Sequence, residues 1–231
     1  MSNSFNNKYL VRGAWGVVAA CLIACGGKRE QGQEPVPQPT APLPTAGIAG
    51  QRVALFPLTL VAAEDSLQWG PLLADRGAAL ARADSVIVSL ITARAPEVTW
   101  VSPEELRRAA RRSGGVAADP GQLGTAILRA ERLTDVPDPL RSQLRTLVGL
   151  AGGRYAMIPA ALVYRRRSAG GVGAQHAAPL HTPPTATAEL AIVLVDARLG
   201  KVGWRTIARG DGADPWGALT MAVKALTPGL P

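Results

Sequence analysis

The sequence predicts an α/β fold, in which one domain packs helices on a mixed β-sheet as an αβα sandwich. Apolar runs typical of strands alternate with segments whose apolar residues recur every three or four positions, as in helices. Residues 190–195 (LAIVLV) are apolar throughout, as expected of a central strand covered on both faces. A short turn joins this strand to the next one at residues 201–209, which predicts an antiparallel hairpin.

The first half of the domain is predicted to begin with a strand and a helix. Residues 52–61 (RVALFPLTLV) favour a strand, and Pro57 indicates an edge position or a bulge. Residues 72–94 predict a helix, although residues 85–88 (SVIV) would also suit a strand. A short strand is expected at residues 98–101. The helix prediction rests on the spacing of Leu72, Arg76, Leu80, Ala83, Ile87 and Leu90.

Four dipeptides predict helix starts, because each places an N-cap oxygen before a proline at the first helical position. They are Ser102-Pro103, Asp119-Pro120, Asp138-Pro139 and Asp214-Pro215. Ser102 and Glu105 also have the spacing of a capping box. Two starts precede core-facing stripes, which are Leu140, Leu144, Leu147, Val148 and Ala151, and then Trp216, Leu219, Val223 and Leu226.

The second half of the domain contains the longest predicted strands. Residues 155–166 and 186–196 flank a loop at 167–184 that is rich in Gly and Pro. Asp196 follows the central strand and is expected to cap the turn before Gly200, where glycine suits a left-handed conformation.

Residues 1–24 have the features of an export signal. Lys8 and Arg12 precede a mostly apolar, uncharged run at residues 13–24, which is shorter than the roughly 20 residues of a membrane-spanning helix. The run leads into Leu22-Ile23-Ala24-Cys25, which resembles the lipobox of bacterial lipoproteins. That resemblance implies cleavage before Cys25 and covalent lipid on Cys25, while Cys21 fits the pattern more loosely. A cleaved signal with two incidental cysteines and an uncleaved anchor are the alternatives.

The lipobox resemblance also predicts a location. Gly26 rather than Asp follows the cysteine, which implies sorting to the periplasmic side of the outer membrane in a host with two membranes. The inner membrane and the cell surface are the other envelope locations. Loss of residues 1–24 removes two cations and lowers the formal charge from +8 to +6.

The remaining chain divides into a tether and a domain. Residues 25–50 contain the lipidated cysteine and a Pro-rich segment with Gln, Gly and Thr, which predicts a disordered tether. An arm packed loosely on the domain is the alternative. Residues 51–231 are long enough to form one well-buried domain.

The order of elements resembles a group of envelope proteins. The motifs are VALFPL at 53–58, VTWVSPEEL at 98–106, GGRYAMIPAAL at 152–162 and AIVLVDARLGKVGWR at 191–205. They are similar to those of the curli-secretion lipoprotein (CsgG-like), a lipoprotein activator of a penicillin-binding protein (LpoB-like) and the N-terminal domain of TolB. The resemblance implies a domain that serves binding and assembly and does not break bonds, with the oligomeric state left open.

Composition and motifs indicate no catalytic or metal site. Both cysteines lie in the first 25 residues, so the domain has no thiolate. His176 and His181 lie in the loop at 167–184, and no Asp or Glu occurs between Leu140 and Ala188 to complete a metal site with them. No P-loop, G-x-S-x-G or H-E-x-x-H motif is present. We therefore predict no enzyme, and no cofactor apart from the lipid on Cys25.

Two arginine clusters are the candidate binding residues. One is a helical set, Arg107, Arg108, Arg111 and Arg112, and the other is a set at a strand end, Arg165, Arg166 and Arg167. The first follows Glu104 and Glu105, so it suits either a solvated helix end or an anion-facing patch. The second could meet lipid phosphates, an acidic glycan or an acidic partner. Nucleic acid is disfavoured, because the chain is predicted to be exported and only 4% of its residues are aromatic.

The sequence as a whole predicts a membrane-anchored, non-catalytic adaptor that binds an envelope protein or a cell-wall glycan polymer. One alternative is a CsgG-like subunit of a secretion channel, which needs membrane-crossing strands with alternating apolar residues. The segment 165–184 does not alternate in this way. The other alternative is an envelope hydrolase without a recognised motif.

Overall fold

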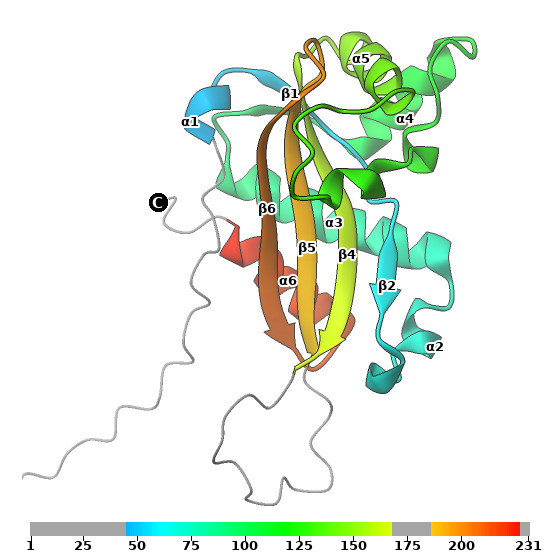
Figure 1. The fold of residues 1–231 in the computed structure, drawn as a ribbon, viewed down its shortest axis with the longest axis vertical. Helices are drawn as coiled ribbons and strands as arrows, with labels where there is room; N and C mark the ends of the chain where they lie inside the picture. The colour runs from blue at the N-terminus through cyan, green and yellow to red at the C-terminus, as the bar shows by residue number, and fades with distance from the viewer. Residues whose placement is uncertain (1–44, 168–185, 227–231) are drawn as a thin grey trace, which may run out of the picture. The chain divides into compact units, whose positions relative to one another are not determined.

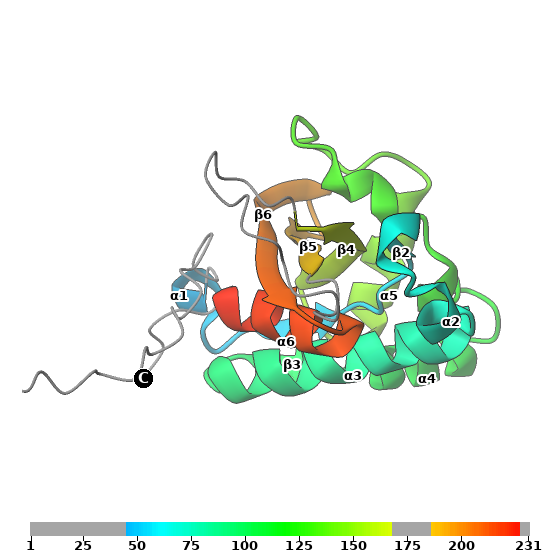
Figure 2. The same cartoon turned by 90° about the horizontal axis from the view of Figure 1, so that it is seen from below.

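The computed structural model describes residues 45–167 and 186–226. In these residues a six-stranded mixed sheet lies between two layers of helices, which confirms the predicted αβα sandwich (Figures 1 and 2). The strand order is β3-β1-β4-β5-β6, and β2 also pairs with β4. The strands are β1 (Arg52–Leu55), β2 (Val61–Ala63), β3 (Thr99–Val101), β4 (Tyr155–Arg166), β5 (Ala186–Asp196) and β6 (Lys201–Gly212).

Parallel and antiparallel pairing divide the sheet. Three pairs of strands are parallel. Strand β1 pairs with β3 on one side and with β4 on the other, and β2 pairs with β4. Strands β4, β5 and β6 form an antiparallel meander, which confirms the predicted hairpin between β5 and β6. Glu189 lies opposite Arg209, and Thr187 lies opposite both Arg165 and Asp211.

The predicted strand at 52–61 is two strands along the same edge of β4. Pro57 falls between β1 and β2, because proline has no N–H for the ladder. The irregularity predicted at Pro57 is present, since the six steps from Leu55 to Val61 lie along only five steps of β4, from Met157 to Leu162, and β2 pairs with β4 alone. Phe56 still donates to the Met157 carbonyl and Leu60 already accepts from the Leu162 N–H, so the regular pairing with β4 is interrupted only around Pro57.

Helices cover both faces of the sheet. Ala83 and Ile87 of α3 and Leu219 of α6 pack in one core, whereas Leu106 of α4 and Leu144 of α5 pack in the other. Figure 2 shows α3 and α6 side by side beneath the strands. The helical segments are α1 (Thr45–Ile48), η1 (Asp65–Leu67), α2 (Gly70–Leu73), α3 (Arg76–Arg94), α4 (Pro103–Arg112), η2 (Pro120–Gln122), η3 (Thr125–Arg129), α5 (Leu140–Leu150) and α6 (Pro215–Ala225).

The predicted helix at 72–94 is α2 followed by α3. Helix α3 runs unbroken through residues 85–88, so the alternative of a strand there was wrong. The helix begins after Asp75, whose Oδ1 accepts a hydrogen bond from the Ala78 N–H at 2.9 Å. Leu72 is 58% exposed and therefore lies outside the buried stripe that its spacing predicted.

The four predicted helix starts have different outcomes. Ser102 forms the capping box with Glu105, and Asp214 accepts the N–H groups of Trp216 and Gly217, both at 3.0 Å. Asp119 caps only the short 3₁₀ helix η2. Asp138 precedes the N-cap residue of α5, which is Pro139, and its carboxylate accepts from the Ser142 hydroxyl and the Arg141 guanidinium.

The described fold begins at Thr45, within the stretch predicted as tether. Ile48 of α1 is only 2% exposed in the core, so residues 45–50 belong to the domain. Residues 1–44, with Cys21 and Cys25, lie outside the described residues, as does the segment 168–185 with His176 and His181. None of the described helices is long and apolar enough to cross a membrane.

Candidate functional site

Within residues 45–167 and 186–226, one part of the sheet has no helical layer over it. Along β4, β5 and β6, the face opposite α6 is covered by α5 and η3 near the start of β4 and is open toward its end (Figure 1). Arg205 of β6 marks the boundary, because its guanidinium donates to the carbonyls of Leu128, Glu131 and Leu133 at 2.6–3.0 Å. Beyond it lies a polar sheet face beside the predicted loop.

Charged residues of alternating sign cross this open face, and we call them the charge ladder: Glu64, Arg165, Glu189 and Arg209, with Arg167 and Asp211 at the strand ends. Glu189 is the centre, since Arg165 Nε and Arg209 Nε each lie 3.0 Å from one of its oxygens. Such cross-strand pairs of opposite charge stabilise a sheet by about 0.2–1 kcal/mol each.

The predicted cluster Arg165, Arg166 and Arg167 lies at this face, and two of its guanidinium groups have acidic partners. Arg165 Nη1 lies 3.5 Å from Glu64 Oε1, and Arg167 Nη1 lies 3.0 Å from Asp211 Oδ2. The backbone N–H of Arg166 donates to Glu64 Oε2 at 3.0 Å. The cluster is thus part of an ion-paired surface and is not a field of free positive charge.

The electrostatics of Glu189 fit its central position. Burial by itself would raise the pKa of this carboxyl, but the hydrogen bonds from Arg165 and Arg209 outweigh it and lower the pKa below 4.5. Glu189 is therefore ionised wherever the surrounding solution is near neutral. The alternation of charge along the ladder is a fixed feature of the folded domain.

The second predicted cluster, on α4, is divided between structural and exposed residues. Arg107 donates to Asp84 Oδ2 on α3 at 2.9 Å, and only 8% of the Asp84 side chain is exposed. Arg108 pairs with Glu104 one turn earlier, whereas Arg111 and Arg112 are exposed. Arg107 therefore joins two helices, a role that the sequence did not reveal.

Asp196 has the predicted structural role and a further one. Its Oδ1 accepts the N–H groups of Arg198 and Leu199, which caps the turn, and Gly200 has the left-handed conformation expected of it. Its Oδ2 accepts from the Arg154 guanidinium at 2.6 Å and 2.9 Å. That pairing was missed because Arg154 lies far away in sequence at the start of β4.

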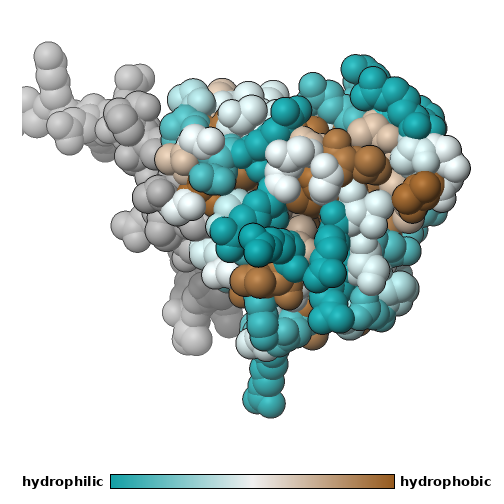
Figure 3. Space-filling model, turned by 90° about the horizontal axis from the view of Figure 1, so that it is seen from above, coloured by the Kyte–Doolittle hydropathy of each residue, from teal (hydrophilic) through white to brown (hydrophobic). Residues whose placement is uncertain are grey.

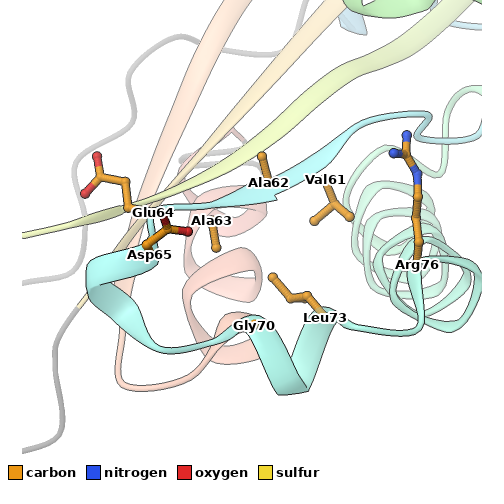
Figure 4. Close-up of a pocket in the computed structure, with 8 residues that line it drawn as sticks. All are labelled: Val61, Ala62, Ala63, Glu64, Asp65, Gly70, Leu73 and Arg76. Atoms are coloured by element: carbon orange, nitrogen blue, oxygen red, sulfur yellow. The ribbon is translucent and has the colours of Figure 1, made fainter.

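A small pocket opens beside β2 (Figure 4). Its volume is about 230 Å³, below the range of roughly 300–1,000 Å³ that is typical of small-molecule sites. Glu64 is drawn at one side and Arg76 at the other, and Arg76 already donates to the Thr59 carbonyl at 2.8 Å. The lining residues are Val61, Ala62, Ala63, Glu64, Asp65, Gly70, Leu73 and Arg76.

The described residues contain no group of three or more His, Cys, Asp or Glu side chains placed to hold a metal ion. What the arrangement can do is present a rigid, charged sheet face to another macromolecule.

No protein-family model matches the chain, and no curated protein matches it. Similar solved structures include the LpoB C-terminal domain from Salmonella enterica, with 16% identity, a TM-score of 0.34, and coverage of 71% of this chain and 83% of that one. The PelC dodecamer from Paraburkholderia phytofirmans has 14% identity, a TM-score of 0.34 and coverage of 78% and 86%. Lipoprotein GNA1162 from Neisseria meningitidis has 16% identity, a TM-score of 0.30 and coverage of 70% and 83%. At such identities and TM-scores, no function is carried over to this chain.

Proposed function

We propose that this chain is a non-catalytic envelope lipoprotein that acts as a binding or assembly adaptor. In this proposal, acylated Cys25 holds the chain on the periplasmic side of the outer membrane. Residues 26–44 provide reach, at most about 59 Å at about 3.1 Å per residue. The α/β domain then binds a partner in the envelope.

The open sheet face with its charge ladder supports this proposal best. A sheet face with fixed charges of alternating sign selects a partner by complementary charge and sets the register of binding. A uniformly anionic polymer would meet Glu64, Glu189 and Asp211 as well as the arginines. The ladder therefore favours an envelope protein over a cell-wall glycan as the partner.

The anchor is tested by mass spectrometry of the mature N-terminus from chains carrying Cys25→Ser or Cys21→Ser. We expect Cys25→Ser to abolish acylation and membrane retention, and Cys21→Ser to leave both intact. If acylation persisted in Cys25→Ser and vanished in Cys21→Ser, the lipid attachment site would be Cys21 and the assignment to Cys25 would be wrong.

The adaptor role is tested by crosslinking in intact envelopes. The first variant reverses the charge of Arg165, Arg166 and Arg167 together, and the second exchanges Arg167 and Asp211, which keeps their ion pair but reverses its direction. We expect both variants to lose the same partner. Reversal of the exposed Arg111 and Arg112 is the matched control and should keep that partner. An identical set of crosslinked proteins in all four chains would refute the role of the ladder.

A further inference from the structure

The opposite end of the domain has a different charge pattern. Here the start of β1, the C-terminus of α5 and the turn between β5 and β6 lie side by side. Arg154 connects them, because it precedes β4, pairs with Asp196, and accepts the Ala197 N–H at its carbonyl. We call this surface the hairpin end. It consists of Arg52, Arg145, Leu150, Arg198 and Leu199.

Three cations at the hairpin end have no acidic partner within residues 45–167 and 186–226. Arg145 donates to the Arg198 carbonyl at 2.9 Å, which holds it against the turn without neutralising it. The Arg52 and Arg198 guanidinium groups are exposed and have no hydrogen bond or ion pair there.

The nearby acids are mostly engaged by other cations. Asp196 pairs with Arg154, Asp138 with Arg141 and Asp135 with Lys201, all at distances below 3 Å. Glu97, before β3, is exposed and is the acid that remains near Arg52. The hairpin end therefore keeps an excess of positive charge, unlike the balanced charge ladder.

Two large apolar side chains project among these arginines. Leu150 ends α5 and is 45% exposed, and Leu199 is 56% exposed at the tip of the turn. Figure 3 looks down on this end and shows hydrophobic residues set between hydrophilic ones. Arginines with leucines between them suit a membrane surface, because phosphates attract the cations while the leucines enter the boundary of the acyl chains.

The chain also enters the domain at the hairpin end. Gln51 accepts the Thr99 N–H just before β1, and Gly50 donates to the Glu97 carbonyl, so α1 and the entry segment lie at this end (Figure 1). Strand β4 extends about 36 Å from this end to Arg166, at about 3.3 Å per residue. That length is several times the screening length of about 8 Å at physiological salt.

We propose that the hairpin end binds the anionic phospholipid surface of the membrane and so turns the charge ladder away from it. The inference rests on the proposed lipid anchor for its biological setting. Its physical basis is the set of Arg52, Arg145 and Arg198, which have no acidic partner among the described residues, together with Leu150 and Leu199. Each arginine near an anionic surface contributes about a fivefold gain in binding at low salt.

The test uses residues 25–231 with Cys25→Ser, so that no acyl chain contributes to binding. The probe is vesicles of phosphatidylethanolamine with phosphatidylglycerol, compared with vesicles in which phosphatidylcholine replaces phosphatidylglycerol. We expect co-sedimentation with the anionic vesicles that weakens as salt rises. Absence of binding to anionic vesicles, or equal binding to both kinds, would overturn the proposal while leaving the anchor at Cys25 intact.

Two variants locate the surface. Arg52→Gln with Arg198→Gln removes two charges whose guanidinium groups make no hydrogen bond or ion pair with other described residues, and we expect binding to fall about thirtyfold. Leu150→Ser with Leu199→Ser should weaken binding without changing its salt dependence. The matched control is Arg166→Gln with Arg167→Gln at the far end of β4, which should bind like the parent chain. Equal loss in the control and in the Arg52 and Arg198 variant would show non-specific attraction and refute the assignment.

Discussion

Asp84 is the residue whose replacement tests the helix packing most directly. Its Oδ1 accepts the N–H of Leu58 at 2.7 Å, and its Oδ2 accepts from Arg107 at 2.9 Å. Asp84→Ala leaves the buried Leu58 N–H without a partner, which costs about 1–3 kcal/mol. It also removes the partner of Arg107, whose side chain is 34% exposed and can be solvated at smaller cost. We expect a loss of about 2–3 kcal/mol, or a melting temperature about 4–12 °C lower.

Asp84→Asn separates the hydrogen bond from the charge. The amide oxygen can still accept from Leu58, so we expect a loss below about 1 kcal/mol. Burial raises the pKa of Asp84 above 3.8, against the lowering effect of its Leu58 and Arg107 contacts. The native state therefore binds a proton more tightly than the unfolded state. The free energy of unfolding of the parent, measured relative to Asp84→Asn, should fall as the pH rises from 3.8 through the raised pKa.

Urea unfolding of the parent and of both variants at several pH values supplies the measurement. The reasoning fails if Asp84→Ala and Asp84→Asn are equally stable, since the Leu58 hydrogen bond would then contribute nothing. It also fails if the parent gains stability over Asp84→Asn with rising pH, because that slope requires a lowered pKa.

Three further predictions concern β6, α6 and the charge ladder. Gly210→Ala would place a Cβ about 2.6 Å from the Ala218 carbonyl oxygen of α6, so we expect urea unfolding to show a loss of stability of about 1–3 kcal/mol or more. Gly203→Ala on the same strand is the control and should be tolerated. Equal stability of the two variants would contradict the close packing of α6 on β6. Asp214→Ala should lose about 0.5–2 kcal/mol in thermal unfolding, and Asp214→Asn only a few tenths, because Asn keeps an N-cap oxygen. The pKa of Glu189 is lower in the folded state than in the unfolded state. The stability that its charge contributes is therefore present above pH 4.5 and disappears as the pH falls through the lowered pKa. The parent and Glu189→Gln should therefore converge on acidification, and a gap that is independent of pH would contradict the ion pairing.

Most elements of the fold could be predicted because their signals are local. The capping box of Ser102 and Glu105 spans three residues, and its geometry depends on little else. The strands at 155–166 and 186–196 have the predicted bounds, since long apolar runs are unambiguous. Asp138 had the same local signal as Asp214, but α5 begins at Leu140, one residue later than the predicted first helical position at Pro139.

The binding surfaces were less predictable, because their character depends on distant partners. A run of three arginines predicted a positive patch at residues 165–167. Folding brings Glu64 and Asp211 to Arg165 and Arg167, across separations of 101 and 44 residues. The spread of Arg52, Arg145 and Arg198 along the chain concealed their proximity at the hairpin end.

The sequence by itself determined the type and order of the elements and predicted a lipidated N-terminus. Those features follow from periodicity, caps and short motifs, which act over a few neighbouring residues. Only the tertiary structure decided which charges are neutralised and which are free, because the field at a side chain depends on groups that folding brings within a few ångströms. It left Arg52, Arg145 and Arg198 without acidic partners among the described residues, and it turned the predicted arginine cluster into one side of an ion-paired ladder.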